Sequence, residues 1–221
     1  MIRRLSAEAL GTALLLVSVI GSGVMGVNLA GGNLAITLLA NAIATGCMLY
    51  VIITVLGPIS GAHFNPAVSL AFFLRGELPG RGLGGYVAAQ LVGGIAGVWA
   101  THLMFGLPVF EISQTMHRTG GAQWWSELIA TLGLLLVIFG GLKARAEAVP
   151  TLVALYITGA YWFTASTSFA NPAVTVARGF SDTFAGINPA HIPAFILAQL
   201  VAVGLAHVGL GALLEGPERS D

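Results

Sequence analysis

Two copies of an asparagine–proline–alanine motif are the residues of this chain best suited to hydrogen-bond chemistry. Asn65-Pro66-Ala67 continues into Val-Ser-Leu-Ala, and Asn171-Pro172-Ala173 continues into Val-Thr-Val-Ala. The residue before a proline is driven out of helical geometry, asparagine is a preferred N-cap, and proline is favoured at the first helical position. Each motif therefore predicts the start of a helix, with the asparagine oxygen capping it and the amide N–H groups free to donate into a lumen. Two such helix starts also present positive partial charge.

The apolar segments that follow the two motifs are too short to cross a bilayer. They run over 65–74 and 171–179. At about 1.5 Å per residue, each reaches roughly 15 Å, which is half of the hydrocarbon thickness. The motifs are 106 residues apart, about half the chain length. We therefore expect two re-entrant half-helices that enter from opposite faces and meet start to start, with the backbone before each one buried or lining a cavity.

The composition requires a membrane protein to hold these half-helices. Apolar residues make up 56% of the 221 residues and charged residues 8%, with a mean hydropathy of +0.88, whereas soluble domains are about 25% charged. The net charge is zero, so no nucleic-acid partner is expected. A single cysteine, Cys47, allows no internal disulfide and no metal cluster. We find no nucleophile–base pair and no phosphate loop, so an enzyme is not expected.

Six apolar stretches have the length that a membrane span needs. They are 6–27, 33–55, 82–106, 124–142, 149–166 and 190–214. An even number of spans places both termini on one side, and basic residues are enriched on cytoplasmic faces. Arg118 and Arg178 fall on one side, against seven on the other. These seven are Arg3, Arg4, Arg75, Arg81, Lys143, Arg145 and Arg219. Both termini are therefore predicted to be cytoplasmic.

The two halves of the chain repeat more than the Asn-Pro-Ala motif. Glu8-Ala-Leu-Gly-Thr in the first span matches Glu127-Leu-Ile-Ala-Thr in the fourth. The chain thus reads as one transmembrane channel domain, 1–221, with repeats over about 1–106 and 124–214. Each repeat holds three spans, an odd number, so the second enters the membrane inverted, an arrangement that places a pathway at the midplane.

Glu8 and Glu127 lie in apolar spans, where a charge costs a few kcal/mol. One interpretation is a proton-coupled transport site. The other is that each carboxylate accepts hydrogen bonds from its re-entrant loop, and the repeat-matched positions favour that second interpretation. A third Asn-Pro-Ala begins at Asn188. Pro193 would disrupt a half-helix there, so Asn188 is predicted to cap the last span. Gly93-x-x-x-Gly97 predicts close helix packing.

The chain resembles the aquaporin (major intrinsic protein) family over essentially its whole length. The resemblance rests on His63-Phe-Asn-Pro-Ala-Val, Phe169-Ala-Asn-Pro-Ala and Glu8-x-x-Gly-Thr. It implies an all-α integral membrane fold, a right-handed bundle of six transmembrane helices plus two re-entrant half-helices. It also implies a homotetramer in a bacterial inner membrane, with one pore per subunit for small uncharged solutes, refusal of ions and protons, and no cofactor or metal.

The resemblance also implies a selectivity filter, by offset from the two asparagines. Its positions here are Thr45, Gly159, Ser168 and Val174. Relatives carry an arginine where this chain has Val174, and aromatic residues beside it. All four side chains here are small and uncharged, so we expect a wide constriction.

Three further single residues have expected roles near this filter. His63, two residues before the first motif, is expected in the cytoplasmic half of the pore. Arg178, four residues after Val174, is expected at the outer membrane surface, the alternative being that it replaces the missing filter charge. Cys47 is expected to face lipid or the core.

Three hypotheses follow for the function. The first is passive diffusion of glycerol, urea-like polyols and amides, and uncharged metalloids such as arsenous acid, together with water. The second is a water-selective channel whose filter is completed by Arg178. The third, less favoured, is a proton-coupled secondary transporter that uses Glu8 and Glu127.

Overall fold

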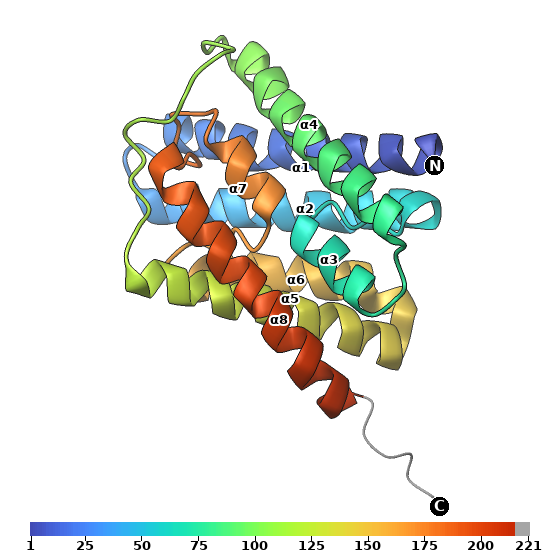
Figure 1. Cartoon of the computed structure of the whole chain (residues 1–221). Coiled ribbons are helices and arrows are strands. Elements are labelled where there is room, and N and C mark those ends of the chain that lie inside the picture. The colour runs from blue at the N-terminus through green and yellow to red at the C-terminus, as the bar shows by residue number, and fades with distance from the viewer. Residues whose placement is uncertain (215–221) are drawn as a thin grey trace, which may run out of the picture.

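A computed structural model describes residues 1–214 of the chain, and all regular elements within them are helical (Figure 1). Arg219, one of the seven basic residues assigned to the cytoplasmic side, lies outside the described residues. The elements are α1 (Ile2–Leu29), α2 (Leu34–Ser60), α3 (Pro66–Leu74), α4 (Gly80–Phe105), α5 (Gly121–Arg145), the 3-10 turn η1 (Ala146–Ala148), α6 (Val149–Phe163), α7 (Pro172–Arg178), the 3-10 turn η2 (Pro189–His191) and α8 (Ile192–Leu214).

The long helices match the predicted spans. Five helical stretches are long and apolar enough to cross a membrane, and one of them, Gly121–Phe163, is 43 residues long. The turn η1 divides that stretch into α5 and α6, which pack against each other, so it supplies two of the six predicted spans. Most helices extend a few residues beyond the predicted windows. α6 instead ends three residues early, because Thr164 adopts an extended conformation and its hydroxyl bonds the Ala160 carbonyl.

Both predicted half-helices form, as α3 and α7. Asn65 and Asn171 are extended N-caps, and each side-chain oxygen accepts the backbone N–H of the alanine two residues on, at 2.9 Å. Asn188 caps η2, which leads directly into α8. The third Asn-Pro-Ala therefore starts the last long helix, as predicted.

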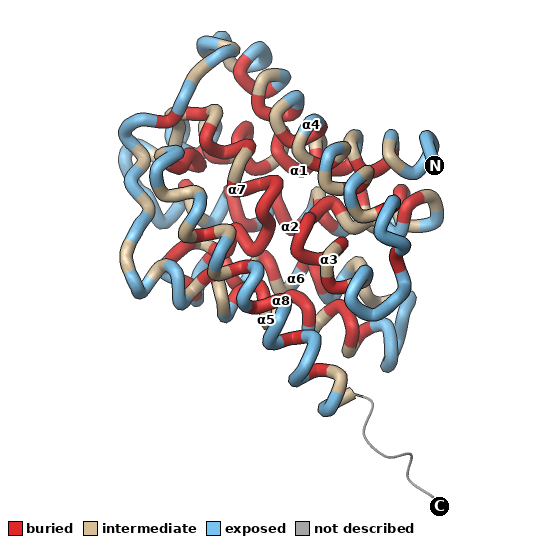
Figure 2. The backbone as a smooth tube through the Cα atoms, in the orientation of Figure 1, coloured by how far each residue is buried: buried red, intermediate tan, exposed pale blue. Residues whose placement is uncertain are grey.

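The chain repeats one order of elements: two long helices, a half-helix and a long helix. α1 packs on α2 and α4, α5 packs on α6 and α8, and α2 with α6 joins the halves. α3 and α7 lie between the long helices in the middle of the bundle (Figure 1). Buried residues gather where these two half-helices approach each other (Figure 2).

The N-terminus and the end of α8 point to the same end of the bundle (Figure 1). This follows from an even number of passes. We call the opposite end, where α1 joins α2 and α4 joins α5, the distal end. The segment between Phe105 and Gly121 crosses the distal end and has no helix of its own.

α1 and α4 approach closely through two glycines. A Cβ placed on Gly93 would lie 2.7 Å from the carbonyl carbon of Ala9, and one on Gly97 would lie 2.8 Å from the Cα of Ala13. These separations are too short for real atoms, so only glycine allows the two backbones to come this near. The predicted packing role of Gly93-x-x-x-Gly97 is confirmed.

Candidate functional site

The two Asn-Pro-Ala motifs are joined by reciprocal hydrogen bonds. Asn65 Nδ2 donates to the carbonyl of Ala170 at 2.7 Å, and Asn171 Nδ2 donates to the carbonyl of Phe64 at 2.8 Å. Phe64 and Ala170 have φ of 48° and 47°, a left-handed conformation rare for residues with side chains. One N–H of each amide is thereby used, so the expectation that the amides are wholly free is corrected. The other N–H of each remains for the lumen.

A buried carboxylate holds the first re-entrant loop in this strained conformation. Glu8 is fully buried. Its Oε1 accepts from the Ser60 hydroxyl at 2.6 Å and the His63 N–H at 3.0 Å, and its Oε2 accepts from the Phe64 N–H at 2.7 Å and Gln90 Nε2 at 2.8 Å. Four donors satisfy the charge and offset the backbone strain, which costs about 1–3 kcal/mol per residue.

Glu127 holds the second re-entrant loop in the same way. It is also fully buried, and its two oxygens accept the N–H groups of Phe169 and Ala170, both at 2.8 Å, while Gln199 Nε2 donates at 2.6 Å. Neither carboxylate lines the cavity described below. This geometry gives no support to a proton-coupled transport site, because a transported proton would have to displace these donors.

The two glutamines are functional residues that sequence reasoning missed. Gln90 donates to Glu8 and to Ser69 Oγ at 3.0 Å, and Gln199 donates to Glu127 and to Thr175 Oγ1 at 3.0 Å. Each thus ties a carboxylate to a half-helix. The signal was present in the sequence, because both glutamines lie in an Ala-Gln-Leu-Val tetrapeptide inside an apolar span of each half.

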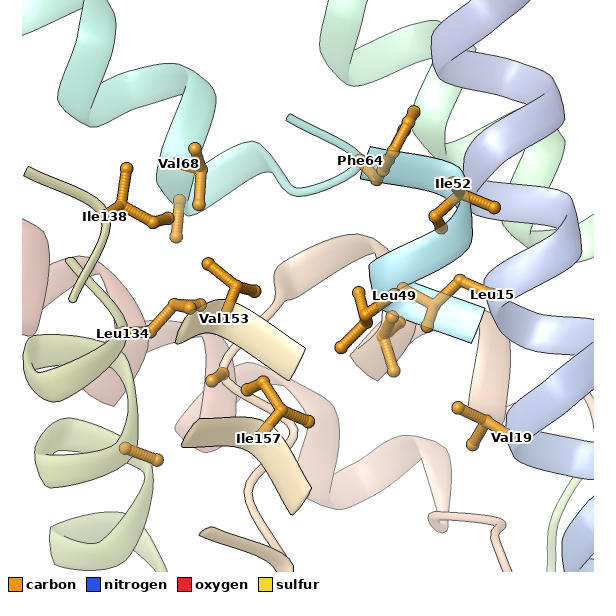
Figure 3. Packing of buried hydrophobic residues seen from close by; sticks show 14 of the residues in the cluster. Leu15, Val19, Leu49, Ile52, Phe64, Val68, Leu134, Ile138, Val153 and Ile157 are labelled. Atoms are coloured by element: carbon orange, nitrogen blue, oxygen red, sulfur yellow. The ribbon is translucent and has the colours of Figure 1, made fainter. Parts of the chain in front are cut away.

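A cavity of about 120 Å³ passes the two asparagines. It extends from Val19 and Thr45 in the distal half to Leu142 and Val149 near the opposite end. Figure 3 shows apolar side chains of α1 and α2 facing those of α5 and α6 across this space. Five polar side chains interrupt the apolar wall: Thr45, His63, Asn65, Tyr161 and Asn171. No Asp, Glu, Lys or Arg side chain among residues 1–214 lines it.

The wall is built from residues four apart, which share one face of a helix. α6 contributes Val149, Val153, Ile157 and Tyr161. α2 contributes Thr45, Leu49 and Ile53, and α5 contributes Leu134, Ile138 and Leu142, each with the same spacing. Each helix therefore presents one narrow stripe, and residues two positions away from a stripe point elsewhere.

This rotation of α6 corrects one of the four predicted filter residues. Thr45 and Val174 line the cavity, but Gly159 does not. Gly159 lies on the opposite face of α6, where a Cβ would meet Phe163. Tyr161 takes the position on the wall, with its hydroxyl 3.3 Å from Thr45 Oγ1. An aromatic side chain therefore stands beside Thr45, at a position outside the four that the offsets predict.

Ser168 is buried but is not among the residues that line the cavity. Its φ is 50°, and its Oγ has no hydrogen-bond partner among the described residues. His63 lines the cavity on the side of the termini. Its ring stacks on Phe72 with centroids 4.5 Å apart, and its Nδ1 is 3.0 Å from Ser69 Oγ.

Arg178 is not at the membrane surface, where it was expected. Its side chain is 2% exposed. Its Nε donates to the carbonyl of Ala185, and its guanidinium carbon lies 3.4 Å from the centroid of Phe169. The seven-residue α7 is too short to carry this side chain out of the protein, so it is enclosed by the segment that follows. Arg178 does not line the cavity, and it does not complete a filter there.

Cys47 is exposed on α2, on the side away from the cavity wall. Groups of three or more His, Cys, Asp or Glu with metal-binding geometry do not occur in the described part of the chain.

Comparison with known proteins agrees with this geometry. The family model described as Major intrinsic protein matches residues 1–169. The chain belongs to the major intrinsic protein family. Proteins of this family are membrane channels, so the chain is a channel and not an enzyme.

Several relatives within the major intrinsic protein family are similar to this chain. It is 56% identical to the aquaglyceroporin AqpS of Rhizobium meliloti (strain 1021) over 90% of this chain and 84% of that protein. It is 38% identical to aquaporin NIP1-1 of Zea mays over 63% of this chain and 49% of that protein. The X-ray structure of the aquaglyceroporin from Plasmodium falciparum matches with a TM-score of 0.72 over 97% of this chain and 98% of that one. At 20% identity, this last match shows the aquaporin-like fold alone.

Proposed function

We propose that the chain is a channel through which glycerol and other small neutral solutes diffuse passively. The observation that carries this proposal is the cavity wall, which is apolar except for five neutral polar side chains. A polyol has a carbon backbone that suits the apolar stripes and hydroxyls that suit Thr45, Tyr161 and the two asparagines. The similarity to a protein named aquaglyceroporin AqpS supports the same solute class. Urea and undissociated metalloid hydroxides such as arsenous acid share the small size and neutrality, and water accompanies them.

Residue roles follow from this function. Asn65 and Asn171 hydrogen-bond the solute at the midpoint, Thr45 and Val174 border the narrow region, and Tyr161 completes it in place of Gly159. Ser168 shapes this region from behind the wall, through its backbone. His63 faces the solute in the half near the termini. Glu8 and Glu127 fix the loops from behind the pore.

Ions are refused at the midpoint because the passage offers a cation no carboxylate and two helix N-termini of positive partial charge. A proton has no chain of waters with a common orientation there, because a central water accepts hydrogen bonds from both asparagines. A water-selective filter completed by Arg178 is not favoured, since that guanidinium is enclosed beneath Phe169.

The organisation that we propose is one channel domain of two inverted repeats. Both termini face the cytoplasm of a bacterial inner membrane, and the distal end faces outward. Arg118 and Arg178 are then the basic residues of the outer side among residues 1–214. The basic residues of the cytoplasmic end are Arg3, Arg4, Arg75, Arg81, Lys143 and Arg145, as the positive-inside rule requires. Four copies assemble as a homotetramer, with one pore in each subunit.

A permeability panel on purified protein in liposomes tests this function. We expect stopped-flow light scattering to show glycerol, urea and arsenite entry well above that of empty vesicles, with no dependence on a pH gradient. Val174→Arg places a long cation in the narrow region, so glycerol flux should fall by about tenfold, a barrier increase of about 1.4 kcal/mol, while water flux falls much less. Equal loss of all permeants in Val174→Arg would contradict the filter role of Val174. Water flux without glycerol flux in the unmodified protein would contradict the proposed solute class.

A further inference from the structure

The connection between α4 and α5 is folded down onto the distal end of the bundle. Its middle is bonded to the segment that follows α7. Ser113 N–H donates to the Gly179 carbonyl at 2.9 Å, and Asn188 N–H donates to the Met116 carbonyl at 2.9 Å. The Asp182 carboxylate accepts the backbone N–H groups of residues 114 and 115 at 3.0 and 2.9 Å. This connection is therefore a fixed part of the distal surface.

The hydrogen bonds of this connection place the side chain of Arg118 inside the protein. The Arg118 backbone N–H donates to His191 Nδ1 at 3.1 Å. Its Nε donates to the Gly186 carbonyl at 2.8 Å, and its Nη2 donates to the Phe184 carbonyl at 3.0 Å. Its Nη1 lies 3.4 Å from Thr167 Oγ1. Arginine has five N–H donors, and these contacts use three of them, which leaves two for a solute or water.

The position of Arg118 relates it to the solute pathway. Thr167 lies in the re-entrant loop that leads to Asn171, two residues before Phe169. The guanidinium carbon of Arg118 is 5.3 Å from the ring centroid of Phe169, a residue that lines the cavity. Arg118 thus lies beside the loop that leads to Asn171, at the distal end of the cavity. We call this region the distal entrance. Arg178 contacts the same ring at 3.4 Å, but its full enclosure keeps it from an entering solute.

The charge of Arg118 matters because the passage itself is neutral. Val174 brings no charge to the narrow region, and no charged side chain of residues 1–214 lines the cavity. Burial lowers the pKa of Arg118, while Tyr161 and Glu127 act in the opposite direction. An arginine keeps its proton at neutral pH even so. The guanidinium is thus a charged group beside the distal entrance, with two N–H donors that no described contact uses.

We propose that Arg118 is a specificity-determining residue of the entrance. It repels cations before they reach the neutral narrow region, and it donates hydrogen bonds to the hydroxyls of an entering polyol. The cationic group of the outer mouth is thus supplied by the α4–α5 connection rather than by α7. This proposal rests on the proposed function, because it concerns the same pathway.

Removing the charge tests the proposal. In liposomes, Arg118→Gln should raise the ratio of methylammonium to glycerol permeability by about tenfold or more, which corresponds to a barrier lower by about 1.4 kcal/mol, while Arg118→Lys should keep the ratio within a few-fold of the unmodified protein. Arg145→Gln is the matched control, because Arg145 is exposed at the opposite end and its ion pair within residues 1–214 is with Glu147. The ratio is independent of the amount of folded protein. An unchanged ratio in Arg118→Gln, together with glycerol flux in the unmodified protein, would overturn the role of Arg118 alone. Unmodified protein without glycerol flux would overturn the proposed function.

Chemical modification of residue 118 tests its position independently. In a Cys47→Ser background, Arg118→Cys provides a single thiol, which is treated on both faces with a trimethylammonium methanethiosulfonate or with its sulfonate-bearing counterpart. Both reagents should slow glycerol flux, and only the cationic one should restore the exclusion of methylammonium. Modification that leaves both fluxes unchanged would show that residue 118 is remote from the pathway and would overturn the proposal.

Discussion

At the residue scale, the centre of the protein is held by polar groups that satisfy one another across the two halves. Residues with positive φ turn the carbonyls of Phe64 and Ala170 toward the opposite asparagine amides. Such a conformation persists only where neighbouring groups enforce it. The buried carboxylates of Glu8 and Glu127 do this, because they bind the N–H groups that the strained loops cannot satisfy internally.

Changing one of these carboxylates to an amide is expected to destabilise the protein. In Glu127→Gln, the side-chain NH₂ cannot accept a hydrogen bond, so the N–H of Phe169 or of Ala170 loses its acceptor. A buried unsatisfied donor costs about 1–3 kcal/mol. The melting temperature in detergent should fall accordingly. Glu147→Gln, at an exposed glutamate of the η1 turn, is the control, and equal melting temperatures for the two variants would contradict a loop-anchoring role for Glu127.

At the element scale, the half-helices are fixed by local caps and the long helices by close packing. α3 and α7 begin where a proline follows a capping asparagine, so their starting points require no tertiary information. The rotation of the long helices does require it. α4 is locked against α1 by the approach at Gly93 and Gly97, and α6 is turned so that Tyr161 rather than Gly159 meets the cavity.

The glycine contact gives a prediction with a control in the same helix. Gly93→Ala would bring a Cβ to 2.7 Å from the Cα and the carbonyl carbon of Ala9, and closer still to its carbonyl oxygen, so α1 and α4 must separate. Overpacking of this kind costs about 1–3 kcal/mol. Gly84→Ala is the control, because a Cβ there meets nothing within 4 Å. Thermal unfolding in detergent should show a lower melting temperature for Gly93→Ala alone. Equal melting temperatures for the two variants would mean that the α1–α4 contact is looser than the structure shows.

At the scale of the whole molecule, the distal surface joins parts of the chain that are far apart in sequence. The α4–α5 connection is held to the segment between α7 and α8 by Asp182, which accepts hydrogen bonds from Ser113, Gln114 and Thr115. This junction positions Arg118 at the entrance. The charge of the outer mouth therefore depends on a contact between the two halves and not on either half alone.

The junction has a defined pH dependence. Burial raises the pKa of Asp182, but the hydrogen bonds from Thr115, Gln114 and Ser113 outweigh it and hold this pKa below its ordinary 3.8. Because the folded pKa is depressed, the stabilisation is fully present above pH 3.8 and is lost as the pH falls through the lower folded value. Hydrogen exchange at the N–H groups of Gln114 and Thr115, which Asp182 accepts, should therefore be constant from about pH 7 to about pH 5 after correction for intrinsic rates.

Asp182→Asn checks the same junction at neutral pH. The variant lacks the charge that strengthens these hydrogen bonds, so exchange at residues 113–118 should become faster while exchange in α1 does not change. Glu147→Gln serves as the control for loss of one carboxylate elsewhere. Unaltered exchange at residues 113–118 in Asp182→Asn would mean that the connection is held by its backbone bonds alone.

The sequence by itself determined the class of the protein and the framework of the pathway. Hydropathy located the long helices, and the Asn-Pro pairs located the starts of α3 and α7, because both signals act over a few neighbouring residues. The match between Glu8 and Glu127 indicated two equivalent loops. The Ala-Gln-Leu-Val tetrapeptide, which occurs once in each half, carries the signal for the glutamine partners of these two carboxylates.

Only the tertiary structure decided which side chains border the pathway. Tyr161 replaced Gly159 because the rotation of α6 is set by its packing on α2 and α5. Arg178 was enclosed because the chain after α7 folds back over it to bond its Nε at Ala185. Arg118 reached the entrance through bonds to residues 49 to 73 positions away. Such positions depend on contacts between distant segments, which no local pattern of residues encodes.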